Sequence, residues 1–174
     1  IDAEESWIKL TFNIGCLRRF IMSRSESVVV TALCMVYDND KILLQDRIKE
    51  DWKGVTFPGG HIEKKESFVK GIEREVFEET GLKIKNIRIC GVKQFQTEDD
   101  ERYIVLLFKT NEFEGELCSS EEGEVFWAER KNLSSYETVD DFYELIKVFD
   151  DENINELMFE GCKEDNHWKW IKKL

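Results

Sequence analysis

The segment GGHIEKKESFVKGIEREVFEETG, Gly59–Gly81, carries the clearest structural pattern in the 174-residue chain. Its second half predicts an amphipathic helix over 67–80, because apolar side chains recur there at intervals of three and four, at Val69, Ile72 and Val76. Ser67 is a suitable N-cap, with Glu66 as an alternative boundary, and Gly81 can adopt the left-handed conformation that ends a helix. The segment therefore reads as a loop leading into a helix with defined ends.

The predicted helix carries three carboxylates at positions i, i+3 and i+4, those of Glu75, Glu78 and Glu79. Side chains at this spacing share one face, and like charges placed there repel one another. Oxygen ligands grouped in this way suit Mg²⁺, which binds carboxylates together with substrate phosphates. A solvated helix face would show the same run of acids, so the helix alone supports both interpretations.

The distances between the fixed residues favour a cation site. Gly60 is followed after five residues by Glu66, and after seven more by the run Arg74–Leu82. This arrangement resembles the Nudix box, G-x5-E-x7-R-E-U-x-E-E-x-G-U with U aliphatic, at each fixed position. The resemblance implies a MutT-like Nudix hydrolase in which Mg²⁺, or Mn²⁺ in its place, is held on a diphosphate.

The resemblance also implies roles for single residues of the box. It places metal ligands at one backbone carbonyl and three carboxylates, those of Gly59, Glu75, Glu78 and Glu79. Arg74 is expected to orient the neighbouring carboxylate and to offset the repulsion. Glu66 can bind Arg74 or the metal shell, Gly60 is expected beside the substrate, and Gly81 caps the helix.

The general base stays open at this stage. Nudix enzymes use either a box glutamate, here Glu75 or Glu78, or a glutamate from a downstream loop. The loop CSSEEGEVFW offers Glu121 and Glu122 just before a predicted strand. An acidic, solvated loop without a catalytic role explains this pair equally well.

Substrate residues are expected outside the box. Resemblance to MutT-type enzymes suggests Arg47, at the end of LLQDR, near the phosphates, Phe57 beside the base, and Arg102 in the pocket. Each has an ordinary alternative, since arginines at strand ends are commonly surface residues and Phe57 can belong to the core.

The sequence TVDD, Thr138–Asp141, has two interpretations. Its S/T-x-x-D/E form predicts a helix capping box, which is the favoured interpretation. The other rests on a resemblance to the paired aspartates that read oxidised purines in animal sanitising enzymes. That interpretation makes Asp140 and Asp141 substrate-binding residues.

The rest of the chain predicts a mixed α/β fold. Strand patterns occupy 27–37, 41–47, 84–96, 102–109 and 124–128, and 55–63 is a short extended piece with a Pro-Gly-Gly turn. A second helix covers 139–149, and the tail is expected to form a short strand or an irregular segment. Strands around two separated helices predict a mixed sheet between helices, and the resemblance implies the α/β/α sandwich of Nudix domains. We expect one domain over 22–174, preceded by an extension or cloning remnant at 1–21.

Composition narrows the possible functions. A net charge of −12 argues against binding to polymeric nucleic acid. The first 22 residues are expected to be neither a signal peptide nor a membrane span, because charges interrupt them throughout. Five scattered cysteines without a C-x-x-C pair, and only two histidines, make a zinc site improbable and indicate free thiols in a cytoplasmic protein. The protein is expected to be a monomer or homodimer.

The expected reaction is hydrolysis of a nucleoside triphosphate, such as the oxidised nucleotide 8-oxo-dGTP, to the monophosphate and pyrophosphate. The alternatives are a Nudix hydrolase for a nucleotide sugar, ADP-ribose or a dinucleoside polyphosphate, and a non-catalytic Nudix domain that binds a nucleotide. The proline and tyrosine that mark the ADP-ribose and dinucleoside enzymes after the box have no counterpart near VKQFQTE.

Overall fold

The computed structural model describes residues 25–48, 52–164 and 167–173, together with the side chains up to residue 160. The extension expected at 1–21, and the side chains of Cys16, Cys162 and His167, lie outside this description. Among the described side chains Cys34, Cys90 and Cys118 are free thiols. No helix in the described part of the chain has both the length and the apolarity needed to cross a membrane.

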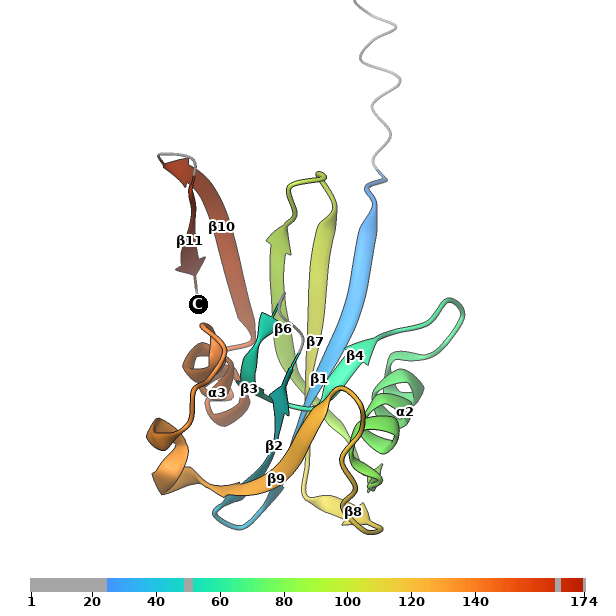
Figure 1. Cartoon of the computed structure of the whole chain (residues 1–174). Helices are drawn as coiled ribbons and strands as arrows, with labels where there is room; N and C mark the ends of the chain where they lie inside the picture. Colours follow the sequence, from blue (N-terminus) through green and yellow to red (C-terminus); the bar gives the residue numbers. More distant parts are fainter. Residues whose placement is uncertain (1–24, 49–51, 165–166, 174) are drawn as a thin grey trace, which may run out of the picture.

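The structure is a mixed sheet with one helix on each face (Figure 1). The strands of the sheet are β1 (Val28–Asp38), β2 (Lys41–Arg47), β3 (Gly54–Thr56), β4 (Gly59–His61), β6 (Arg88–Gln96), β7 (Arg102–Thr110), β9 (Gly123–Glu129), β10 (Glu156–Glu164) and β11 (His167–Lys173). Their main order is β11-β10-β6-β7-β1-β2-β3, with β4 paired to β1 and β9 to β2. The pairs β1–β7 and β10–β6 are parallel and the others antiparallel, so the predicted mixed sheet is confirmed.

Two helices cover the sheet, α2 (Phe68–Thr80) and α3 (Phe142–Asp150). The alternation of β1 explains the layers, because successive side chains of a strand point to opposite faces. Leu33 and Met35 belong to the core beneath α3, whereas Ala32, Cys34 and Val36 belong to the core beneath α2. The α/β sandwich expected from the sequence is thus present. Shorter elements complete it: β5 (Lys83–Lys85) pairs with β8 (Glu112–Glu114), and η2 (Arg130–Ser135) follows β9.

The ends of α2 agree with the sequence prediction. The hydroxyl of Ser67 accepts a hydrogen bond from the backbone N–H of Lys70 at 3.2 Å, as an N-cap does. Gly81 ends the helix with φ of 74°, and its N–H donates to the carbonyl of Phe77. A side chain at position 81 would be strained in this conformation, so the glycine fixes where the acidic helix ends.

The start of α3 differs from the prediction. The helix begins at Phe142, and its N-cap Asp141 makes no side-chain capping bond. Thr138 instead forms a parallel bridge with Val55 at the edge of β3. The predicted capping box is therefore wrong, because the backbone of Thr138 is committed to the sheet and the carboxylate of Asp141 to an ion pair with Lys93. The tail is also more regular than expected, since β10 and β11 form a hairpin.

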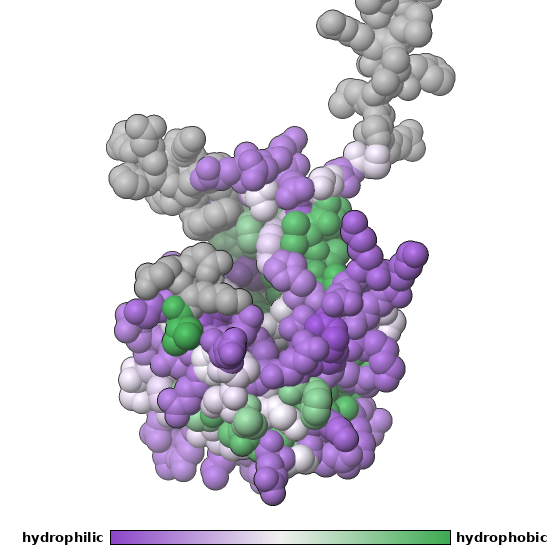
Figure 2. All heavy atoms as spheres, turned by 45° about the vertical axis from the view of Figure 1, so that its right-hand side comes forward, coloured by the Kyte–Doolittle hydropathy of each residue, from purple (hydrophilic) through white to green (hydrophobic). Residues whose placement is uncertain are grey.

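The central strand β1 changes partner along its length. Its residues Thr31–Leu33 pair with β4, and Tyr37–Asp38 pair with β2. The strands β2, β3 and β9 therefore diverge from β4 (Figure 1). A cavity lies beside this divergence. The face drawn in Figure 2 is mostly hydrophilic, with a patch of apolar side chains in its upper part.

Candidate active site

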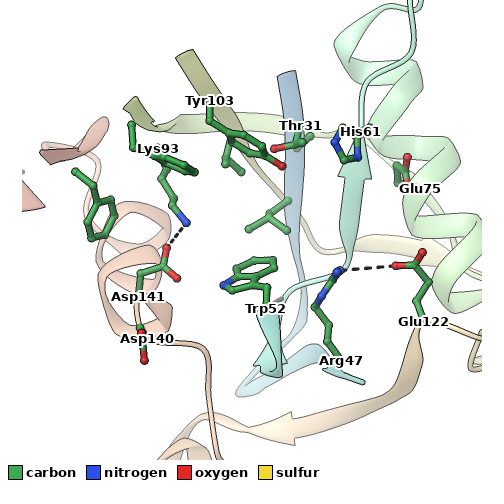
Figure 3. A pocket seen from close by; sticks show the side chains of 15 residues that line it. Thr31, Arg47, Trp52, His61, Glu75, Lys93, Tyr103, Glu122, Asp140 and Asp141 are labelled. Atoms are coloured by element: carbon green, nitrogen blue, oxygen red, sulfur yellow. Dashed lines mark ion pairs between the residues drawn. The ribbon is translucent and has the colours of Figure 1, made fainter. Parts of the chain in front are cut away.

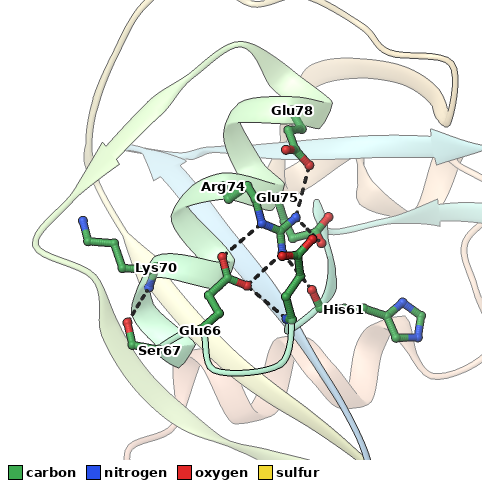
Figure 4. Close-up of polar contacts among 8 residues, drawn as sticks. His61, Glu66, Ser67, Lys70, Arg74, Glu75 and Glu78 are labelled. Carbon is green, nitrogen blue, oxygen red and sulfur yellow. Dashed lines mark hydrogen bonds and ion pairs between the residues drawn. The ribbon is translucent and has the colours of Figure 1, made fainter.

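Arg74 lies at the centre of a polar network on α2 (Figure 4). Its Nε and Nη2 donate to the two carboxylate oxygens of Glu66, each at 3.0 Å, and Nη2 also donates to the carbonyl of His61 at 3.0 Å. Its Nη1 donates to Glu75 at 2.8 Å and to Glu78 at 3.1 Å. One guanidinium thus orients three carboxylates, and its hydrogen bonds lower the pKa of Glu66 below the usual range.

Glu79 faces the interior while Glu78 faces solvent. The Glu79 side chain is only 4% exposed, and its Oε2 accepts a hydrogen bond of 2.7 Å from the backbone N–H of Gly59. Burial raises the pKa of Glu79 to about 7; the Gly59 N–H acts in the opposite direction, and the negative charges of Glu122 and Glu75 raise it further. The carboxylates of Glu75, Glu79 and Glu122 therefore form an acidic group, and little positive charge lies near Glu79 to compensate it.

The backbone of β4 leaves room for one of these carboxylates. A Cβ atom at Gly60 would lie 2.4 Å from Oε2 of Glu75, closer than real contacts allow. A Cβ atom at Gly59 would lie 2.1 Å from the carbonyl oxygen of Ala32, and Gly59 has φ of 149°. Gly59 is therefore required by the backbone, whereas Gly60 is required by the position of Glu75.

The chemistry of these residues fits a hard divalent cation. Carboxylate oxygens are the ligands that Mg²⁺ prefers, and the buried Glu79 gains most from a positive charge nearby. As they stand, no three acidic, histidine or cysteine side chains among the described residues converge into a finished metal site. Arg74 explains this in part, because it holds the carboxylates of Glu75 and Glu78. Glu75 and Glu79, with Glu122 close by, could hold a divalent cation.

A cavity of about 650 Å³ adjoins the acidic group (Figure 3). Glu75 and Glu122 line one side of it, and aromatic rings gather at the other side together with Lys93 and Asp141. Its walls are formed by Thr31, Ala32, Leu33, Arg47, Trp52, His61, Glu75, Lys93, Phe95, Tyr103, Val105, Glu122, Asp140, Asp141 and Phe159. The cavity thus offers a polar acidic end and an aromatic end to one ligand.

Arg47 is placed between these two ends. Its guanidinium lies 5.2 Å from the ring centre of Trp52, and its Nη1 lies 3.7 Å from Oε2 of Glu122. The Nε atom of Arg47 is buried and has no hydrogen-bond partner within the described part of the chain. A buried donor of this kind is costly unless it is satisfied, so Arg47 is suited to bind an anionic group of a ligand.

Two residues expected in the substrate pocket lie elsewhere. Phe57 is only 1% exposed and stacks on Phe142 at 5.1 Å between ring centres, so it is a core residue that a ligand cannot reach. Arg102 does not line the cavity; it donates to Glu26 and to Gln94 at the edge of the sheet. Both expectations for the pocket are therefore wrong, for the reasons that the sequence already offered as alternatives.

In each of the two acidic pairs, Glu121–Glu122 and Asp140–Asp141, the two side chains lie in different surroundings. Glu122 lines the cavity, whereas Glu121 is exposed and does not. Asp141 is buried at the aromatic end, whereas Asp140 is exposed at the rim and points away from Lys93 (Figure 3). Glu122 and both aspartates thus line the cavity, Asp141 as the buried member of its pair, whereas Glu121 does not line it.

Sequence reasoning missed Trp52, Lys93, Tyr103 and His61, which all line the cavity. Trp52 stands alone between charged residues and carries no periodic signal. Lys93 and Tyr103 lie inside strands that were predicted, but a strand pattern does not reveal which face meets a cavity. His61 directly follows Gly59 and Gly60, so its place at the site could have been inferred from the turn alone.

A family model described as the NUDIX domain matches residues 28–152, which is most of the chain. The chain belongs to the Nudix family. Its Nudix relatives include the uncharacterized Nudix hydrolase YvcI of Bacillus subtilis, 30% identical over 107 residues that cover 59% of this chain and 66% of YvcI. The NAD-capped RNA hydrolase NudC of Actinobacillus succinogenes is 39% identical over 94 residues, which cover 51% of this chain and 34% of NudC.

Among solved structures, the MutT protein from Bacillus halodurans superimposes with a TM-score of 0.65 at 24% identity. The superposition covers 83% of this chain and 97% of that protein, which shows the shared Nudix fold. The matched region spans just under two thirds of YvcI and about a third of NudC. The chain therefore matches only part of the length of these two relatives, and it shares its fold with the Bacillus halodurans protein.

Proposed function

We propose that this Nudix protein hydrolyses the phosphoric anhydride bond of a nucleoside triphosphate, releasing the monophosphate and pyrophosphate. The observation that carries this proposal is that one cavity has both an acidic end, at Glu75 and Glu122, and an aromatic end, at Trp52 and Tyr103. A nucleotide has the matching polarity, since its phosphates need cations and its base stacks on aromatic rings.

Each group of the site has a task in this reaction. Glu75, Glu79 and Glu122 would hold Mg²⁺ (or Mn²⁺), which when bound neutralises phosphate charge and lowers the pKa of a water molecule. Arg74 keeps Glu75 oriented, and Arg47 donates to a phosphate oxygen. Glu122 and Glu75 are the candidates for the general base, because both line the cavity; Glu78 is half-exposed and does not.

Initial rates test this proposal directly. Pyrophosphate release from dNTPs and 8-oxo-dGTP should require Mg²⁺, stop with a chelator, and return when Mg²⁺ or Mn²⁺ is added. Glu75→Gln should lower kcat by about 10²-fold or more while leaving the melting temperature near that of the wild type. ADP-ribose, nucleotide sugars and dinucleoside polyphosphates belong in the same panel, because faster hydrolysis of one of them would replace the triphosphate assignment.

A folded, Mg²⁺-loaded protein that hydrolyses none of these compounds would overturn the proposal and favour a nucleotide-binding role. The assignment of an oxidised purine rests on resemblance to MutT-like enzymes. A higher kcat/KM for 8-oxo-dGTP than for dGTP would support it, and equal values would remove it.

A further inference from the structure

Gln45 is a buried polar side chain on the face of β2 that meets α2. It follows Leu43 by two residues, so both side chains point to the same face of the strand. Leu43 belongs to the core beneath α2, together with Ile72 and Val76. Gln45 itself is 0% exposed, so an amide is enclosed between the sheet and the acidic helix.

The hydrogen bonding of this amide is incomplete. Nε2 and Oε1 of Gln45 are both buried, and neither has a hydrogen-bond partner within the described residues. Thr56 lies opposite Gln45 in the β2–β3 pair, and its hydroxyl is also buried and unpartnered there. Directly opposite residues on neighbouring strands have Cβ atoms about 5 Å apart. Two side chains with matching donors and acceptors therefore face each other without using them.

The carboxylate of Glu79 lies next to this amide. Glu79 follows Val76 by one turn of α2 and meets the same layer. Its Oε2 accepts a hydrogen bond of 2.7 Å from the backbone N–H of Gly59, and in the described ion pairs Arg74 binds other acids of the box. Burial raises the pKa of Glu79, and the amide of Gln45 is among the groups that lower it, so the two groups interact. Gln45 can therefore supply a donor to Glu79 from the sheet.

We infer that Gln45 is a positioning residue that holds the carboxylate of Glu79 toward a divalent cation. In this arrangement the hydroxyl of Thr56 donates to Oε1 of Gln45, Nε2 donates to Glu79, and the remaining lone pairs of the carboxylate are left for the ion. Each polar atom of Gln45 and Thr56 then has a partner. The inference rests on the proposed function, in which Glu79 holds the metal ion, and it adds the residues that orient this carboxylate.

The energetics of the amide favour this role over a purely structural one. A buried amide without partners lowers stability, because its atoms give up hydrogen bonds to water and gain none. An apolar side chain of similar length would suit the surrounding layer of Leu43, Ile72 and Val76 better. Groups that hydrogen-bond to a metal ligand, in contrast, commonly change metal affinity by about 10- to 100-fold. Removal of the amide should therefore have opposite effects on stability and on metal binding.

Gln45→Met tests this expectation, because it keeps the length of the side chain and removes both polar atoms. Mn²⁺ titrations followed by electron paramagnetic resonance, without nucleotide, should give a Kd about 10- to 100-fold above that of the wild type. At pH 5, where Glu79 is largely neutral, the metal-free variant should melt at or above the wild-type temperature. Gln94→Met is the matched control, since Gln94 is a strand glutamine whose amide contacts Glu156 and Arg102 instead. It should leave the Kd for Mn²⁺ unchanged.

Metal binding separates this inference from the proposed function. If no triphosphate is hydrolysed but Gln45→Met weakens Mn²⁺ binding, the positioning role stands without the reaction. If triphosphates are hydrolysed, the Mg²⁺ concentration for the half-maximal rate should rise in this variant by about the same factor as the Kd. A wild-type Mn²⁺ affinity in Gln45→Met, an unchanged Mg²⁺ requirement, or a wild type that binds no Mn²⁺ would each overturn the inference.

Two further variants keep the test decisive if Gln45→Met does not fold. Thr56→Val removes the hydroxyl with little change of shape and should raise the Kd for Mn²⁺ by up to about 10-fold. Because Gln45 acts through Glu79, the double variant Gln45→Met/Glu79→Gln should bind Mn²⁺ as tightly as Glu79→Gln alone. An unchanged Kd in Thr56→Val beside an unfolded Gln45→Met, or a further loss of affinity in the double variant, would show that Gln45 does not act through Glu79.

Discussion

Substitution of Gly60 by alanine should separate activity from stability. The new Cβ would lie 2.4 Å from Oε2 and 2.6 Å from Cδ of Glu75, while ordinary van der Waals contact begins at 3.4 Å. The carboxylate must therefore move by about 1 Å, and a displacement of that size at a reacting centre can cost about 10²-fold in rate. The neighbour is the end of a flexible side chain, so the free energy of unfolding should fall by less than about 1 kcal/mol.

Pyrophosphate release and thermal unfolding, measured on the same samples, check this expectation. Gly59→Ala is the contrasting variant, because its Cβ would meet the backbone of Ala32 and its φ disfavours any side chain; it should lose the fold as well as the activity. If Gly60→Ala acts through Glu75, the double variant Gly60→Ala/Glu75→Gln should be no slower than Glu75→Gln alone. An unchanged kcat in Gly60→Ala, or additive losses in the double variant, would refute the argument.

Three further changes test other parts of the structure. Without metal, the raised pKa of Glu79 means that unfolding releases a proton from this group between pH 4.5 and 7. The contribution of protonated Glu79 to stability is therefore fully present below pH 4.5 and is lost as the pH rises through 7. The stability of Glu79→Gln relative to the wild type should therefore increase from pH 5 to pH 8 by about 3 kcal/mol in the free energy of unfolding, measured as a difference in melting temperature. In a separate measurement, Mg²⁺ should raise the melting temperature of the wild type more than that of this variant. Arg74→Met should lower the melting temperature by about 5 °C or more, measured beside Arg88→Met, which breaks only the exposed pair with Glu152 and should have little effect. Phe57→Ala should cost about 3–5 kcal/mol in denaturant unfolding, and at a temperature where it stays folded its preference among nucleotides should equal that of the wild type.

Local signals explain which parts of the fold could be predicted. The limits of α2 follow from Ser67 and Gly81, and β2 agrees with its predicted range, because both depend on residues close in sequence. The predicted strand over 84–96 divides into β5 and β6, and β8 was not predicted. The short strands β5 and β8 pair with each other although they are far apart in the sequence. Pairing between distant segments leaves little trace in a single sequence.

The candidate site also has a part that could be predicted from local sequence and a part that could not. The box residues are fixed by spacing on one turn and one helix, so Arg74 and Glu79 could be assigned from the sequence. The cavity is formed where β6, β7 and the start of α3 meet, and no local pattern indicates that Lys93 would face Asp141 across 48 residues of chain. For the same reason Phe57 could not be distinguished from a pocket aromatic until Phe142 and Phe149 were seen to enclose it.

The guanidinium of Arg74 has a consequence for the order in which the protein matures. It already supplies a positive charge to Glu66, Glu75 and Glu78, so the acidic helix does not depend on an external ion while the chain folds. We therefore expect the chain to fold before it binds a divalent ion. Among the described contacts, Glu79 is the box carboxylate that Arg74 does not bind, and it accepts a hydrogen bond from the backbone N–H of Gly59.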